Sequence, residues 1–137
     1  MIKWYIDTSI WMDIYEDRRG YYSEPLGDYA LKLLSMIKAK NDCLIITDLL
    51  IRELEVGYSM EAIRGMMLPF EKIIERVFVT KEQRDEALII AAKKGVPPGD
   101  VTHAIIARDN NCVLITRDNH FKKLEDIWQY NKPEEFI

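Results

Sequence analysis

The sequence predicts an α/β protein: a three-layer α/β/α sandwich around a central, mostly parallel sheet of four to five strands. Two observations support this fold class. Short, continuous apolar runs at residues 43–46 and 112–115 are typical of strands buried on both faces of a parallel sheet. These runs alternate with segments in which apolar residues recur at the 3.6-residue period of a helix. This alternation favours helices packed on both faces of one sheet.

Length and composition indicate a single soluble domain spanning residues 1–137. The chain is 48% apolar and 31% charged, as in ordinary globular proteins. No apolar run approaches the roughly 20 residues of a membrane span, and the N-terminus does not have the pattern of a signal peptide. We therefore expect a cytoplasmic protein with no membrane partner. Cys43 and Cys112 each begin an apolar run, which favours buried thiols over a disulfide or a zinc site.

The net charge of −4 argues against capture of nucleic acid by the whole surface. It does not exclude a local basic rim around an acidic site, because a bound cation reverses the local sign of charge. The candidates for such a rim also have a simpler interpretation as solvated surface charges. They are Arg18, Arg19, Arg52, Arg117, Lys122 and Lys123.

The N-terminal third predicts strand, helix, helix and strand in that order. An apolar strand at residues 4–6 ends in Asp7, and Thr8 or Ser9 is placed to start a helix over residues 8–16. Residues 21–28 are expected to form a loop. The next helix, ending near Lys40, has an apolar face at i, i+3, i+4 and i+7, and a strand at 44–46 follows it. That face consists of Ala30, Leu33, Leu34 and Ile37.

The next predicted helix, residues 49–59 with Thr47 or Asp48 as its cap, contains an unusual acid. At 100° per residue, Glu53 lies between Leu49 and Leu50 on the packed side. Since a buried carboxylate needs a partner, either a metal site or a buried Arg or Lys is expected beside it.

An apolar stripe runs through residues 60–77, interrupted by Pro69. We expect two short helices in series, with Pro69 near the start of the second. The stripe is either core or, in part, a dimer face or a groove for a partner helix. Its members are Met60, Ile63, Met67, Phe70, Ile74 and Val77.

The C-terminal half predicts a strand at 77–79 and then a helix that Thr80 and Gln83 open as a capping box. Gly95 ends that helix. Residues 96–99 are expected to be non-helical, so the next helix begins at or just after Asp100 and ends near residue 110. A strand at 112–116, a turn at 117–121 and a fifth strand at 127–130 complete the chain.

Four acids are expected to meet at one edge of the sheet. Asp7 and Asp118 follow strands, and the carboxyl ends of parallel strands share an edge, roughly 5 Å apart if the strands are neighbours. Asp100 opens a helix at the same edge, and Glu53 points inward. Because converged carboxylates repel one another, a cation is expected among them. Ligands that are all oxygen favour Mg²⁺ or Mn²⁺.

These acids lie in four blocks that resemble the motifs of PIN-domain nucleases, and the resemblance is nearest to the small prokaryotic type of the VapC toxins. The blocks are Asp7-Thr8-Ser9, Glu53-Leu54-x-x-Gly57, Asp100 with Ala104-Ile105-Ile106-Ala107, and Ile115-Thr116-Arg117-Asp118-x-x-Phe121. They follow the order of the family and span nearly the whole chain.

The resemblance implies that Asp7, Glu53, Asp100 and Asp118 bind one or two Mg²⁺ or Mn²⁺ ions and catalyse hydrolysis of RNA, with Ser9 and Thr8 as supporting hydroxyls. It also implies an RNA substrate, a possible antitoxin partner and a homodimer. Many relatives carry a further acid two residues after the last one, where this chain has His120.

Other interpretations stay open at this point. Asp7 and Asp100 would also serve as helix caps and Asp118 as a turn residue. His103 is expected to be structural, and His120 is expected to be a turn or surface residue. A catalytically idle PIN-like module that binds RNA or protein is the main alternative function. A receiver-like phosphoacceptor is disfavoured, since it requires paired acids after its first strand and a Lys after its last.

Overall fold

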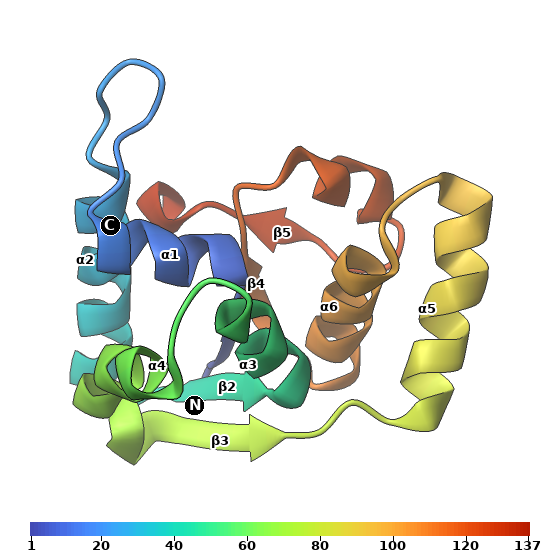
Figure 1. Cartoon of the computed structure of the whole chain (residues 1–137), viewed down its shortest axis with the longest axis horizontal. Coiled ribbons are helices and arrows are strands. Elements are labelled where there is room, and N and C mark those ends of the chain that lie inside the picture. Colours follow the sequence, from blue (N-terminus) through green and yellow to red (C-terminus); the bar gives the residue numbers. More distant parts are fainter.

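A computed structural model describes all 137 residues and shows a five-stranded, all-parallel sheet with helices on both faces (Figure 1). The fold class predicted from the sequence is confirmed. The strand order is β3-β2-β1-β4-β5, so the first strand lies in the centre. None of the helices has the length and apolar character that a membrane span requires.

The strands are β1 (Lys3–Ile6), β2 (Cys43–Thr47), β3 (Ile74–Val77), β4 (Val113–Ile115) and β5 (Tyr130–Asn131). The helices are α1 (Thr8–Glu16), α2 (Leu26–Ala39), α3 (Asp48–Glu55), α4 (Met60–Met67), α5 (Lys81–Lys94) and α6 (Pro98–Asp109). Three short 3₁₀ segments accompany them: η1 (Leu68–Ile73), η2 (Asn119–Leu124) and η3 (Pro133–Glu135).

Side chains of β1 alternate between two apolar cores because successive residues of a strand point to opposite faces. Trp4 and Ile6 pack with residues of α1, α2 and α4, whereas Tyr5 packs with residues of α5 and α6. Helices α5 and α6 lie together on one side of the sheet in Figure 1. The C-terminal tail returns to the first core, where the rings of Phe136 and Trp4 meet edge to face at 5.0 Å.

Two helix boundaries in the N-terminal half differ from the prediction. Helix α2 begins at Leu26, inside the predicted loop of residues 21–28. Gly27 allows this early start, because a Cβ there would lie 2.7 Å from the Asp13 carbonyl oxygen of α1. Helix α3 ends at Glu55 instead of near residue 59, since the Ser59 hydroxyl accepts from the Ala62 N–H and caps α4.

Two strands are displaced from their predicted positions. Strand β3 covers Ile74–Val77, not 77–79, because Ile74 pairs with Leu44 of β2. Strand β5 covers Tyr130–Asn131, not 127–130, and pairs with β4. In both places the pairing with the neighbouring strand sets the boundary, and the apolar pattern of the segment does not reveal it.

Prolines mark two further differences. Helix α6 begins at Pro98, within the stretch predicted to be non-helical, because the first turn of a helix needs no N–H from its residues. Pro69 lies near the start of its segment as expected, but that segment, η1, is a 3₁₀ helix and not an α-helix. Most of the apolar stripe of residues 60–77 is core, which was one of the two interpretations of the sequence. Ile63 and Phe70 are buried, whereas Met60 is 42% exposed.

Candidate functional site

The register of the sheet places three polar side chains side by side at the carboxyl ends of β2, β1 and β4. Tyr5 pairs with Ile45, and Ile6 pairs with Ile115. Continued past the strand ends, this register puts Thr47, Asp7 and Thr116 at one level. The Asp7 N–H donates to the Ile115 carbonyl oxygen at 2.9 Å, which extends the β1–β4 ladder to this level.

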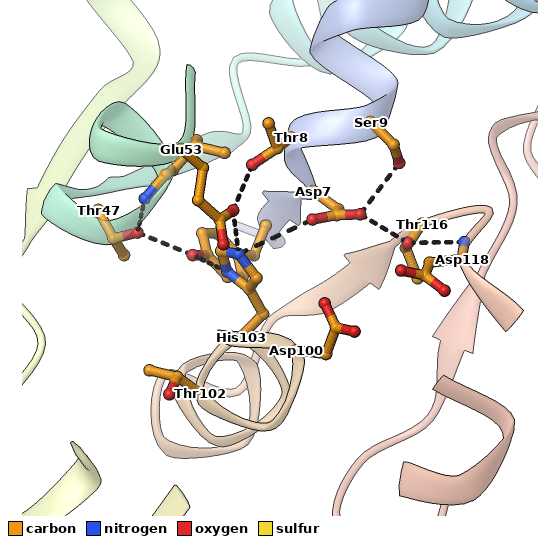
Figure 2. A network of polar contacts seen from close by, with 12 residues as sticks. Asp7, Thr8, Ser9, Thr47, Glu53, Asp100, Thr102, His103, Thr116 and Asp118 are labelled. Atoms are coloured by element: carbon orange, nitrogen blue, oxygen red, sulfur yellow. Dashed lines mark hydrogen bonds and ion pairs between the residues drawn. The ribbon is translucent and has the colours of Figure 1, made fainter. Parts of the chain in front are cut away.

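Asp7 is buried, and hydroxyl groups hold one of its carboxylate oxygens (Figure 2). Oδ2 accepts from the Thr116 hydroxyl at 2.8 Å and from the Ser9 hydroxyl at 3.0 Å. Thr116 Oγ1 in turn accepts from the Asp118 N–H at 3.1 Å, which links the two strand-end acids. The other oxygen, Oδ1, makes no hydrogen bond and lies 3.8 Å from Nε2 of His103.

Glu53 points from α3 toward Asp7, and its partners are a hydroxyl and an imidazole, not a buried Arg or Lys. Oε1 accepts from the Thr8 hydroxyl at 2.6 Å and contacts His103 Nε2 at 2.7 Å. Burial raises the pKa of Glu53, but the hydrogen bond and charge of His103, with the Thr8 hydroxyl, bring it below its ordinary value. Oε2 makes no hydrogen bond and faces Gly99.

His103 is fully buried and connects Glu53 to the sheet, so it touches the acid cluster instead of serving the core alone. Its Nδ1 lies 2.6 Å from the Tyr5 hydroxyl, which lies 2.8 Å from Oγ1 of Thr47. Burial lowers the pKa of His103, but Glu53 and the charge of Asp7 outweigh burial and raise it. The sequence held a signal for this role, since His103 follows Asp100 by three residues and so shares its helix face.

Asp100, Asp118 and His120 form a second group beside the first, with ligating atoms within 4.8 Å of one another. His120 Nδ1 lies 2.8 Å from Asp100 Oδ2 and 3.2 Å from Asp118 Oδ1, which also accepts from the His120 N–H. His120 is half-exposed, yet it contacts both acids. The prediction of a turn or surface residue did not include these contacts. Burial, followed by the charges of Asp118 and Asp7, raises the pKa of Asp100 despite His120.

The four acids share one arrangement: each has one oxygen in a hydrogen bond and one oxygen without any. The anchored atoms are Asp7 Oδ2, Glu53 Oε1, Asp100 Oδ2 and Asp118 Oδ1. The open oxygens carry negative charge at a common edge, and neighbouring acids disfavour ionisation of Asp100. This oxygen-rich donor set fits a hard divalent cation such as Mg²⁺ or Mn²⁺.

Half of the candidate basic rim is engaged in ion pairs within the chain. Arg117 binds both oxygens of Glu134 at 2.8 and 2.7 Å and lies 3.6 Å from buried Asp13. Arg18 pairs with Glu16, and Arg52 pairs with Asp48. The others, Arg19, Lys122 and Lys123, form no ion pair with an acid. Arg117 therefore anchors the tail and is not a free phosphate contact.

Comparisons with known proteins identify the family and the fold of the chain. The family model described as "PIN domain" matches residues 4–127. A search of curated sequences gave no significant match.

Three solved structures share the fold at low identity. VapBC2 from Rickettsia felis bound to a DNA fragment from its promoter has a TM-score of 0.63, 20% identity and coverage of 89% of this chain and 92% of that one. A toxin–antitoxin complex from Klebsiella pneumoniae has a TM-score of 0.66 and 15% identity, with coverage of 95% and 97%. PAE2754 from Pyrobaculum aerophilum has a TM-score of 0.59 and 17% identity, with coverage of 98% and 93%.

Proposed function

Because this chain belongs to the PIN-domain family, we propose that it is a metal-dependent endoribonuclease that hydrolyses phosphodiester bonds of RNA. Asp7, Glu53, Asp100 and Asp118 are the proposed cation-binding and catalytic residues. The observation that supports this most directly is the one oxygen that each of them keeps free of hydrogen bonds at the carboxyl edge of the sheet. The cofactor we propose is Mg²⁺ or Mn²⁺, as one or two ions.

The residues around the acids fix the direction of each carboxylate. Ser9 and Thr116 hold Asp7 by one oxygen, and Thr8 and His103 hold Glu53 in the same way. A divalent cation bound there lowers the pKa of water and offsets the charge of the phosphate. No side chain is needed as a nucleophile. The protein instead orients the four carboxylates and keeps other hydrogen-bond donors away from their open oxygens.

We further propose that the protein is the toxin of a toxin–antitoxin pair, acting on RNA in the cytoplasm. Two solved structures with this fold are a VapBC2 and a toxin–antitoxin complex, and this chain covers more than nine-tenths of both chains. An antitoxin protein and a second copy of the chain are the proposed partners. Met60 and Leu68 are exposed within residues 60–77, and we propose this surface as the binding site for one of these partners.

Cleavage of RNA by the purified protein tests the proposed activity. Total RNA would be incubated with the protein in Mg²⁺ or Mn²⁺, with and without EDTA. Asp7→Asn and Asp100→Asn should each slow cleavage by about 100-fold or more, whereas the surface acid variant Asp126→Asn should cleave normally. Activity that survives EDTA, or that is unchanged in both cluster variants, would refute the proposed metal site.

Metal binding measured by calorimetry separates the nuclease from the idle module. Binding of Mn²⁺ by the wild type, lost in Asp7→Asn, is expected if the acids hold a cation. A protein that binds RNA but neither binds Mn²⁺ nor cleaves would instead be an idle RNA-binding module.

Growth arrest on expression, relieved by Asp7→Asn, is the expected result for a toxin.

A further inference from the structure

A small apolar cavity lies beside the acid cluster, between α3, α5 and the start of α6. Its volume is about 240 Å³, and its apolar lining includes Leu49 of α3, Leu88 of α5 and Val79. Leu88 is 58% exposed, so the cavity opens to solvent on the α5 side. A hollow of this size is below the roughly 300–1,000 Å³ of pockets for drug-sized ligands. It suits one planar ring system and is too small for the face of a partner helix.

The cavity and the acid cluster share a wall. Gly99 is part of the cavity lining, and a Cβ at this position would lie 3.2 Å from Oε2 of Glu53. That oxygen is the one that Glu53 leaves open. Asp100 follows Gly99 directly, and Arg52 of the lining precedes Glu53 on α3. A nucleotide chain whose phosphate lies at the open oxygens would therefore bring its neighbouring base to the cavity.

Two arginines line this cavity; Arg84 pairs with no acid, whereas the charge of Arg52 is offset by Asp48. Arg84 donates to the Val79 carbonyl oxygen at 3.1 Å, and Arg52 donates to Asp48 at 2.9 Å. Each guanidinium has five N–H donors, so these contacts orient the groups without using all their donors. In a protein of net charge −4, guanidinium donors on one small apolar hollow suit a neutral aromatic group that is joined to a phosphate.

We propose that this cavity binds a nucleobase of the RNA substrate, adjacent to the phosphodiester bond at the acid cluster. Leucine and valine side chains contact the faces of the base, and the Arg52 and Arg84 guanidiniums contact its edge or its phosphate. Bases that are splayed from a single strand are the part of RNA that proteins read most often. The inference rests on the proposed nuclease function and adds to it the position of a base subsite.

Filling the cavity with a larger side chain tests the inference. Leu88→Trp would be compared with Leu31→Trp, an exposed leucine of helix α2 that lies away from the cavity. The probe is a fluorescein-labelled, single-stranded RNA pool of random sequence, cleaved under single-turnover conditions over a range of protein concentrations. We expect Leu88→Trp to raise the half-saturating protein concentration about tenfold. The maximal rate should change less than threefold, and Leu31→Trp should match the wild type.

Two further measurements keep the outcomes distinct. Arg84→Ala should raise the half-saturating concentration as well, and Mn²⁺ affinity by calorimetry should be unchanged in Leu88→Trp. Equal RNA affinity of Leu88→Trp and wild type, while the wild type cleaves, would overturn the base subsite and leave the nuclease intact. A changed oligomeric state of Leu88→Trp in sedimentation equilibrium would assign the cavity to a contact between copies and also overturn it. No RNA binding by the wild type would overturn both proposals.

Discussion

Replacing Asp100 with Asn should stabilise the protein in the absence of metal and leave it less stable than the wild type in its presence. The carboxyl of Asp100 is half-buried near Asp118, and burial with the charges of Asp118 and Asp7 raises its pKa. An amide has nearly the same shape but no charge. The substitution therefore removes repulsion from the metal-free cluster and one ligand oxygen from the metal-bound cluster.

The expected magnitude follows from the distance between the two acids. Ligating oxygens of Asp100 and Asp118 lie within 4.8 Å of each other. At that separation, two negative charges repel by about 0.9 kcal/mol in water and about 3.5 kcal/mol at an effective dielectric constant of about 20. The low end applies because water reaches both groups, and losing the contact with His120 removes roughly 0–1 kcal/mol of attraction. We therefore expect a net gain of about 0.5 kcal/mol, or about 2 °C in Tm.

Urea denaturation followed by circular dichroism measures both conditions. In EDTA, Asp100→Asn should have the higher free energy of unfolding. With Mn²⁺ at about 100 times its Kd, the wild type should gain about 2.7 kcal/mol and the variant much less, so the order reverses. Asp126→Asn, a surface control whose acid pairs with Lys94, should show no reversal. If Asp100→Asn is less stable in EDTA and gains as much from Mn²⁺ as the wild type, the cluster is not a cation site.

Three further predictions concern groups around the cluster. Arg117→Ala leaves the buried carboxyl of Asp13 without its nearest cation, so the free energy of unfolding in urea should fall by about 3 kcal/mol; an unchanged value would exclude this role. Burial raises the pKa of the Cys43 thiol to about 11 and that of Cys112 to about 12, so both should react slowly with a thiol reagent at about pH 8 until urea unfolds the protein. The pKa of His103 is raised in the fold, so its stabilisation is present below its unfolded pKa of about 6.5 and is lost as pH rises through the folded value. In EDTA, the free energy of unfolding should fall as the pH rises above about 6.5, and His103→Gln should flatten that fall.

The sequence was sufficient to predict the architecture because its strands are short, apolar and separated by helices. It was also sufficient to expect Asp7 and Asp118 at one edge, since that follows from any parallel pairing of β1 and β4. It did not reveal the boundaries of those helices and strands that are set by a tertiary contact. Gly27 permits α2 to begin early only because α1 lies against it, and Ile74 becomes a strand only because β2 is its neighbour.

The polar network behind the acids was the part of the site that the sequence concealed. Tyr5 lies between Trp4 and Ile6, and an apolar run follows His103 along its helix, so both residues fit an interpretation as core. Their hydroxyl and imidazole meet only after β1 and α6 pack together, 98 positions apart along the chain. The i, i+3 spacing of Asp100 and His103 was available, but it predicts a shared helix face and does not identify the partner. The need of Glu53 for a partner was predictable, and the identity of that partner was not.

Three neighbouring strands end in the same way, and this places hydroxyl groups, not basic side chains, beside the buried carboxylate of Asp7. Each apolar run closes with isoleucine, and the next residue is Thr47 on β2, Asp7 on β1 and Thr116 on β4. The central acid therefore lies between two hydroxyl-bearing residues: the Thr116 hydroxyl donates a hydrogen bond to Asp7, whereas the Thr47 hydroxyl bonds Tyr5. A lysine or arginine in either flanking position would satisfy the carboxylate and occupy the place of a cation. The Ser9 and Thr116 hydroxyls hold one oxygen of Asp7 in place and leave the other without a hydrogen bond, as the proposed divalent cation site requires.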